Sequence, residues 1–521
     1  MKNTTSSSLK PASKIPSAFA SPPELRDFSF ASEFGGAKFN DKRLVKQVSG
    51  IADAAWRCPE SSIPTMLGSP SRAEGLYRLV ANKKVQADSI IQPHVNNTIA
   101  RCANVGCIIV ASDSTVNGYG SDSKRKGMGE TAAGGLGFTL HGSIAIAENT
   151  GKLLGLLRQT TWVRSKPADE QVDGGTDPTA VGDVLQSKGK TKSKAKRVRV
   201  AQDDPTNESG RWLEHAVACG KALGDLERVH VADRESDDYK YFAGLCAAGE
   251  SFVTRVSTDR VLAEGKRLFT EMQGMVVQLC RKVHIEPHKP SPSAKARKTN
   301  PPREQRDAKL QVSAGTITIP RSSRAPLTTP QTLTLNYVLV EEIDVADGNS
   351  PVIWRLVTTL PVETPEQIAR IVDIYRMRWV IEEYWKALKT GCSFGEHQLE
   401  SYDALVKLLA ILLVVAWKML EIRTIARTEP DSPAELVLTA QQVKCLQVLH
   451  NIRHPKTPLP DKPTVKEALW AIAGLGGHFK QNGEPGWQTI GRGLRRLLQA
   501  EEDALALMAI LQPSAQRRRP N

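Results

Sequence analysis

Residues 374–391 read IYRMRWVIEEYWKALKTG, and this stretch carries two stripes of side chains at helical spacing. Tyr375, Arg378, Glu382, Lys386 and Lys389 follow one another at steps of three or four residues. At roughly 100° per residue, all five fall within an arc of about 80° on one face of a helix. The spacing therefore predicts a helix that presents a tyrosine, a glutamate and three cations side by side.

An apolar stripe on an adjoining face strengthens the prediction of an amphipathic helix. Its members are Met377, Ile381, Tyr384, Trp385 and Leu388. Burial of this stripe would hold the charged stripe in a fixed orientation. Taken alone, the charged stripe favours a solvated surface with pairs four residues apart, such as Glu382 with Lys386. The alternative is a functional site, and only the rest of the chain can decide between them.

Length and charge set the range of possible functions. At 521 residues the chain has room for about two to four domains. Lys and Arg number 70 against 56 Asp and Glu, a formal net charge of +14. This excess predicts a polyanionic partner, either nucleic acid or an anionic membrane surface. The longest apolar run, LLAILLVVAW at 408–417, has about half of the ~20 residues needed to span a bilayer. It predicts a buried helix, and no membrane partner is expected.

The N-terminus and the cysteines favour a cytoplasmic protein. Residues 1–24 are rich in Ser and Pro and lack an apolar core, which predicts a disordered lead rather than a signal peptide. The eight cysteines include no CxxC pair and have no His partner at zinc-ligand spacing. We therefore expect reduced thiols and no structural zinc.

Composition shifts along the chain predict its domain organisation. Residues 25–105 are helical and polar, and their Lys42, Arg43 and Arg78 either contact the DNA backbone or are ordinary surface charges. The expected segments after them are a strand-rich region at 106–259 with a basic polar insertion at 165–210, a β insertion at 260–350, a region at 351–425 that contains the quoted helix, and a helical end at 426–521. The leucine-rich helix at 494–511 is suited to packing on another helix, within the chain or in a dimer.

Two predicted strands end on aspartates. GCIIVASDST (106–115) leads to Asp113 and RVHVADRES (228–236) leads to Asp233. Unbroken apolar runs of this kind indicate strands buried on both faces of a sheet. Carboxylates at such strand ends, facing Glu382 on a helix, can hold Mg²⁺ ions that act on phosphodiesters.

Each acid also has a plain structural reading. An aspartate after a strand commonly caps the next turn. Glu383 competes with Glu382 but points about 100° away from the stripe. Asp237 and Asp238 compete with Asp233 but lie beyond the strand. No set of Cys and His, or of Ser, His and Asp, offers a rival chemistry.

The order of Tyr375, Arg378, Glu382 and Lys389 resembles the YREK signature of DDE cut-and-paste transposases from bacterial insertion elements. The quoted stretch is particularly similar to the group used in tagmentation reagents. ASDST, ADRESD and SFVTR agree in the same order, EGLYRLVAN and ESGRW agree elsewhere, and PGWQTIGRGLRRL agrees more weakly. The resemblance covers roughly residues 30–515.

The resemblance implies an α/β fold with an RNase H-like catalytic core and a β-strand insertion. An N-terminal helical domain that binds DNA ends and a C-terminal helical dimerisation domain would flank this core. It implies Asp113, Asp233 and Glu382 as the catalytic triad, which would bind a pair of Mg²⁺ ions, with Mn²⁺ as a substitute. The 165–210 insertion is longer than the resemblance leads us to expect.

The resemblance also implies roles in DNA binding. Tyr375, Arg378 and Lys389 would bind phosphates near the cleaved end, with Lys386 beside them. Trp354 would stack on a flipped base and so steady a DNA hairpin, with help from Arg255. Arg78, together with the other N-terminal helix residues, would read the element end.

The implied activity is strand cleavage at inverted-repeat element ends, hairpin formation and resolution, and strand transfer into target DNA. The partners would be double-stranded DNA and a second copy of the chain in a homodimer, on the nucleoid in the bacterial cytoplasm. Two other functions stay open: an RNase H-like metal nuclease without strand transfer, and a transposase-derived DNA-binding repressor or inhibitor.

Overall fold

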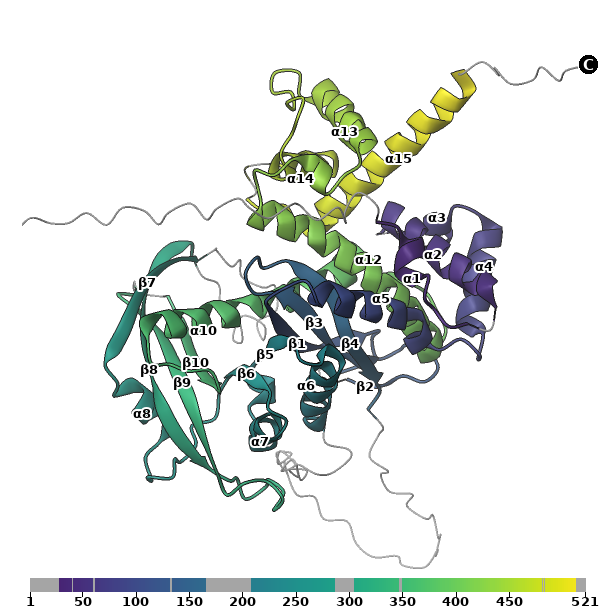
Figure 1. Ribbon diagram of the computed structural model, residues 1–521. Helices are drawn as coiled ribbons and strands as arrows, with labels where there is room; N and C mark the ends of the chain where they lie inside the picture. The colour runs from purple at the N-terminus through teal and green to yellow at the C-terminus, as the bar shows by residue number, and fades with distance from the viewer. Residues whose placement is uncertain are drawn as a thin grey trace, which may run out of the picture.

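The structure is a computed structural model, and its overall arrangement is shown in Figure 1. It describes residues 28–39, 41–59, 61–131, 134–164, 208–285, 304–345, 349–479, 481 and 483–511. The predicted disordered lead at 1–24 and nearly all of the basic insertion at 165–210 lie outside the described residues. The described chain is mixed α/β, as expected, with helices before and after a large sheet.

A single ten-stranded sheet forms the centre of the described chain. Its order is β2-β3-β1-β5-β6-β10-β9-β8-β7, with β4 pairing β3. β1 pairs β5 and β5 pairs β6 in parallel, whereas the other pairs are antiparallel. The bounds are β1 (Cys107–Gly118), β2 (Gly129–Glu130), β3 (Leu136–Ala147), β4 (Leu153–Trp162), β5 (Glu227–Ala232), β6 (Ser251–Arg255), β7 (Val277–Ile285), β8 (Arg306–Pro320), β9 (Thr332–Ile343) and β10 (Ile353–Thr358).

Helices cover both faces of the β1–β5–β6 part of the sheet. Ile108 and Val110 of β1 join a cluster that includes residues of α6 (Gly210–Leu223). Ile109 and Ala111 point to the other face and join the largest core cluster. This two-sided burial explains the unbroken apolar run of β1, because both alternating sets of side chains need an apolar environment.

The region at 260–350 extends this sheet. It contains α8 (Leu268–Gln273) and the antiparallel strands β7, β8 and β9. β9 also pairs with β10 along its length, from Ile353 opposite Glu341 to Thr358 opposite Asn336. The region is therefore continuous with the central sheet through β10.

Five helices precede the sheet, and the last of them, α5, packs against β4. They are α1 (Phe30–Phe34), α2 (Lys42–Arg57), α3 (Ile63–Leu67), α4 (Pro70–Ala81) and α5 (Ala87–Cys102). A buried lysine of α12 (Tyr402–Thr428) connects α12 to the end of α4. Lys407 Nζ donates to the carbonyls of Val80 and Asn82 and to the carboxylate of Asp403. This contact fixes the end of α4 against the core.

Long helices follow the sheet. The apolar run at 408–417 lies inside α12 (Tyr402–Thr428), and all ten of its residues are buried, which confirms the prediction of a buried helix. Beyond α12 lie α13 (Ala440–Arg453), α14 (Val465–Leu475) and α15 (Trp487–Leu511), whereas α7 (Tyr239–Ala247) and α10 (Pro365–Met377) lie beside the sheet. Figure 1 shows α13, α14 and α15 together at one end of α12.

Within the described residues, no helix combines the length and apolar character required to cross a membrane. All eight cysteines are free, in agreement with the expectation of reduced thiols.

Candidate active site

The two predicted aspartates lie at the same level on neighbouring strands. Ala111 of β1 is the last residue in parallel register with β5, opposite Val231. Asp113 follows two residues after Ala111, and Asp233 follows two residues after Val231. Because β1 and β5 run parallel, both aspartates lie at the same end of the two paired segments, the C-terminal end.

The prediction that both strands end on their aspartates is wrong for Asp113. β5 ends at Ala232, but β1 continues to Gly118. It continues because β1 keeps its antiparallel partner β3, in which Gly142 lies opposite Asp113. Asp113 thus projects from within a paired strand.

Asp233 also serves as a cap. Its Oδ1 accepts a hydrogen bond of 2.8 Å from the backbone N–H of Glu235, at the start of η2 (Arg234–Ser236). The competing aspartates have structural partners of their own. Asp237 accepts from the backbone N–H groups of Ser257 and Thr258, and Asp238 caps α7.

The quoted stretch is not one regular helix. α10 ends at Met377, α11 spans Trp379–Lys386, and η3 (Ala387–Gly391) is a π-helical turn. Arg378 keeps helical backbone angles, but its N–H bonds to the carbonyl of Tyr375 three residues earlier. The five side chains of the charged stripe therefore do not form one solvated face, and Tyr375 is buried.

The ion pairs differ from the expected pair of Glu382 with Lys386. Glu382 Oε1 accepts from Arg378 at 2.5 Å, and Lys386 Nζ donates to Glu383 at 2.9 Å. Glu383 is buried and also pairs with Arg423 at 2.9 Å. Glu383 thus anchors α11 to α12, whereas the side chain of Glu382 is 28% exposed beside the sheet.

The other two acids act electrostatically on Asp113. The pKa of Asp113 is raised to about 7, chiefly by burial and then by the nearby charge of Asp233, with a smaller contribution from Glu382, while the charge of Arg378 opposes the rise. Mutual repulsion of this kind is what a bound divalent cation relieves. Asp233 and Glu382 therefore both lie near enough to Asp113 for their charges to act on it.

The donor set fits a hard divalent cation in its chemistry, because all three side chains offer carboxylate oxygens. The residues that the structure describes nevertheless contain no group of three or more His, Cys, Asp or Glu side chains arranged to hold a metal ion. Glu382 pairs with Arg378 instead. The guanidinium provides a positive charge that a cation would otherwise supply.

An aromatic pair and two arginines lie next to the acids. The rings of Trp354, on β10, and Tyr375 meet edge to face with centroids 5.2 Å apart. The guanidinium of Arg378 lies 5.9 Å from the ring of Tyr375. Arg255 donates to the carbonyl of Ile353, next to Trp354, at 3.0 Å. Burial raises the pKa of Tyr375, while Arg378 and Arg255 lower it.

The predicted lysines have different environments. Lys389 Nζ donates to the carbonyl of Val116 in β1 at 2.6 Å, and burial lowers its pKa. Lys386 is half exposed. The N-terminal cations lie elsewhere, on α2 and α4: Lys42 is exposed, Arg43 contacts Asp41 and Arg78 contacts Glu74.

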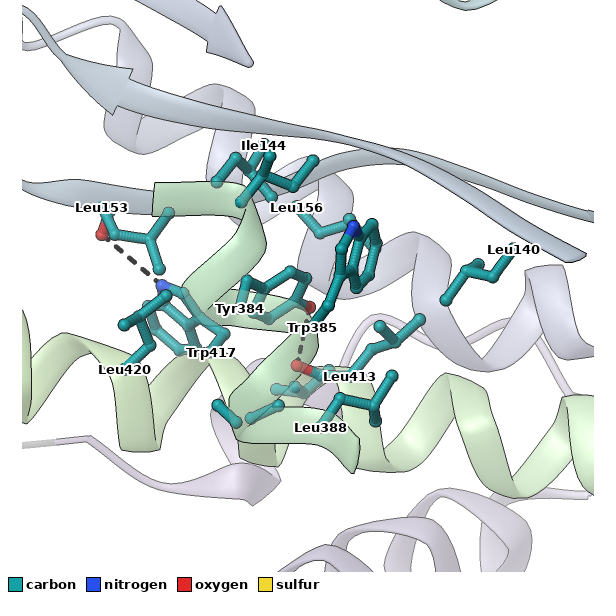
Figure 2. Packing of buried hydrophobic residues seen from close by; sticks show 14 of the residues in the cluster. Leu140, Ile144, Leu153, Leu156, Tyr384, Trp385, Leu388, Leu413, Trp417 and Leu420 are labelled. Carbon is teal, nitrogen blue, oxygen red and sulfur yellow. Dashed lines mark hydrogen bonds between the residues drawn. The ribbon is translucent and has the colours of Figure 1, made fainter. Parts of the chain in front are cut away.

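Trp385 is a site residue that the sequence pattern assigned only to the apolar stripe. Its ring lies among buried side chains between the sheet and α12 (Figure 2). Its Nε1 donates to Oδ2 of Asp113 at 3.1 Å. The one signal available in the sequence is that a buried tryptophan needs an acceptor for its N–H.

Comparison with known proteins identifies two domains. Residues 29–85 match the family described as transposase DNA-binding, and residues 213–417 match the transposase DDE domain, which belongs to the RNase H-like superfamily. The first match contains Lys42, Arg43 and Arg78, and the second contains Asp233 and Glu382. Asp113 lies before the second match and is joined to it by the pairing of β1 with β5.

A cryo-EM structure of the piggyBac transposase synaptic complex with hairpin DNA is a distant structural match. It has 6% sequence identity and a TM-score of 0.34, over 92% of this chain and 75% of that chain. At that score it adds nothing to the assignment, which the two domain matches establish. The chain carries a transposase DNA-binding domain followed by a DDE domain, and it is a DDE transposase that binds DNA.

Proposed function

We propose that this chain is a cut-and-paste transposase of a bacterial insertion element, related to the YREK group. In this proposal a dimer of the chain binds the two inverted-repeat ends, cuts them and joins them to target DNA. The observation that carries it is that Asp113 and Asp233 follow equivalent positions of the parallel strands β1 and β5, with Glu382 near enough for its charge to raise the pKa of Asp113.

The proposed chemistry is a series of displacements at phosphorus. A pair of Mg²⁺ ions held by Asp113, Asp233 and Glu382 would activate the attacking oxygen and stabilise the leaving oxygen. Water first nicks one strand, and the freed 3′-OH attacks the opposite strand to give a hairpin. Water then opens the hairpin, and the same 3′-OH attacks target DNA. One set of acids can serve every step, since each step exchanges one oxygen for another at a phosphodiester.

Arg378 and Lys389 would bind the phosphates that flank the reacting bond. Their present partners, Glu382 and the carbonyl of Val116, hold them next to the acids before DNA arrives. Lysine has three donors and arginine has five, so each keeps donors for a phosphate. Lys386, on the next turn of the same helix as Glu382, would extend this contact.

Trp354 would stack on the base that leaves the helix when the hairpin forms. The edge of its ring already rests against Tyr375, and Arg255 lies beside it. Base stacking on an aromatic side chain is worth about 1–3 kcal/mol. Trp354→Ala should therefore slow hairpin formation about tenfold while leaving first-strand nicking nearly unchanged. Equal slowing of both steps, measured on end-labelled DNA, would count against the stacking role.

The test of the proposal is an incubation of the protein with paired element ends, target DNA and Mg²⁺. The end sequences come from the DNA that flanks the gene, where inverted repeats should lie at both borders. Joined products support the transposase. Products that are cut but never joined would indicate a nuclease, and a gel shift without cutting would indicate a repressor or inhibitor.

A further inference from the structure

We infer that Trp385 is a positioning residue for Asp113, and that Gly142 provides the space that this role needs. The inference rests on the proposed function, in which Asp113 is a metal ligand. It adds two residues that are neither carboxylates nor DNA-contacting cations.

The hydrogen bond from Trp385 fixes one oxygen of the carboxylate. Nε1 of Trp385 donates to Oδ2 of Asp113 at 3.1 Å, and the indole side chain is itself buried. A carboxylate has two oxygens with about four acceptor directions. One bond to Oδ2 therefore restrains the rotation of the carboxyl group and leaves most of its acceptor capacity free.

The indole is suited to this task because it is neutral. It is only a donor, so it can neither ligate a metal nor take up a proton. A lysine or arginine in its place would bring a positive charge beside Asp113 and would oppose the binding of a divalent cation. The tryptophan orients the acid while leaving its charge available.

Gly142 makes room for the ring. It lies opposite Asp113 in the β1–β3 pair, so the two residues share one face of the sheet. A Cβ atom added at Gly142 would lie 2.6 Å from Cη2 and 3.1 Å from Cζ2 of Trp385. A glycine inside a strand commonly marks such a close approach. Strand β3 thus lacks a side chain at the position where the ring lies.

Tyr384 provides a matched control on the same helix. It is also buried, and its hydroxyl donates to the carbonyl of Leu413 at 2.8 Å (Figure 2). Trp385→Phe and Tyr384→Phe each remove one buried hydrogen bond and keep an aromatic ring. If the role of Trp385 were only structural, the two variants should lower the midpoint of thermal unfolding by similar amounts and should bind metal equally well.

The experiment measures Mn²⁺ binding by electron paramagnetic resonance on the full chain bound to end DNA, together with the Mg²⁺ dependence of strand nicking. We expect Trp385→Phe to weaken Mn²⁺ binding about tenfold and to raise the half-saturating Mg²⁺ concentration by a similar factor. Tyr384→Phe should leave both unchanged. Equal values for the two variants would overturn the inference.

Gly142→Ala gives an independent test through the same ring. Alone, it should displace the indole and weaken Mn²⁺ binding in the same direction as Trp385→Phe. In combination, Gly142→Ala with Trp385→Phe should be no worse than Trp385→Phe, because phenylalanine lacks the outer ring atoms that the new methyl group meets. Fully additive losses would contradict the shared mechanism. If wild-type protein neither nicks DNA nor binds Mn²⁺, the proposed function itself fails.

Discussion

The cations predicted to bind DNA fall into two groups with different surroundings. Near the acids, Arg378 is only 12% exposed and is paired with Glu382, and Lys389 is bonded to a strand carbonyl. On the N-terminal helices, the side chains of Arg43 and Arg78 are 93% and 72% exposed. In the proposed function, the buried group would be oriented before DNA binds, whereas the exposed group would adjust to the DNA backbone. The cations near the acids should therefore affect the rate of strand cleavage, and the cations on the N-terminal helices should affect the affinity for DNA.

The largest expected effect separates two adjacent glutamates. Glu382→Ala removes a proposed metal ligand and should lower cleavage by about a thousandfold or more, since ligand-held metal supplies several kcal/mol of charge stabilisation. Binding of end DNA should be kept. Glu383→Ala instead removes the partner of Arg423 and Lys386, so it should lower the free energy of unfolding and spare cleavage by the folded fraction. Full cleavage by the Glu382 variant would refute the assignment.

Arg378 should affect the reaction more than binding. Arg378→Ala removes the charge that lowers the pKa of Asp113 and pairs with Glu382, and it removes a proposed phosphate contact. We expect cleavage to fall by about a hundredfold, as for loss of one preorganised donor at a reacting centre. The control is Arg376→Ala, because Arg376 is half exposed and pairs with Asp373. Similar losses in both variants would contradict the role assigned to Arg378.

Without metal, the raised pKa of Asp113 should make the free energy of unfolding depend on pH. The folded pKa of Asp113 is raised to about 7 from an ordinary value of 3.8, so the folded chain binds more protons than the unfolded chain between these values. Stability should therefore fall as pH rises from about 4 to 7. Asp113→Asn should be more stable than the wild type above pH 7, by about 2–4 kcal/mol at ~1.36 kcal/mol per pKa unit. The difference should vanish near pH 4 in chemical denaturation, and a constant difference would contradict the electrostatic origin.

The smallest effect is expected from the exposed group. Arg78→Ala should weaken binding of end DNA a few-fold at ~0.1 M salt. The salt slope, the slope of the log of the binding constant against the log of the salt concentration, should become shallower by about one, as for loss of a single phosphate contact. Cleavage of bound DNA should not change. Arg453→Ala, an exposed arginine on α13 outside the DNA-binding match, is the control. An unchanged salt slope for Arg78→Ala would place the DNA elsewhere on the helical domain.

Apolar patterning predicted much of the fold. The runs at 106–115 and 228–236 correspond to β1 and β5, and the run at 408–417 corresponds to the centre of α12. These predictions succeed because burial on both sides of an element requires a continuous apolar run. The extension of β1 to Gly118 was missed, since its polar residues do not alternate with apolar ones. The partner of one of them lies across the sheet, because Ser114 bonds to His141 on β3.

The site was predictable in its residue types but not in its contacts. Neither Pro nor Gly stands between Ile374 and Thr390, so nothing local signals the interruption at Arg378 or the π-helical turn. That turn instead coincides with a tertiary contact, from Lys389 to Val116. The partners of Glu382 and Trp385 likewise depend on how the helix meets the sheet. Periodicity places residues on faces, whereas these pairings are set by three-dimensional packing.

The most direct test of the central claim is the position of a bound metal. Crystals of the chain with end DNA, soaked in Mn²⁺, would be measured for anomalous scattering. The proposal predicts a peak between the carboxylates of Asp113 and Asp233, with Glu382 released from Arg378 and turned toward it. A fully occupied Mn²⁺ site elsewhere, with no peak at these acids, would contradict the account.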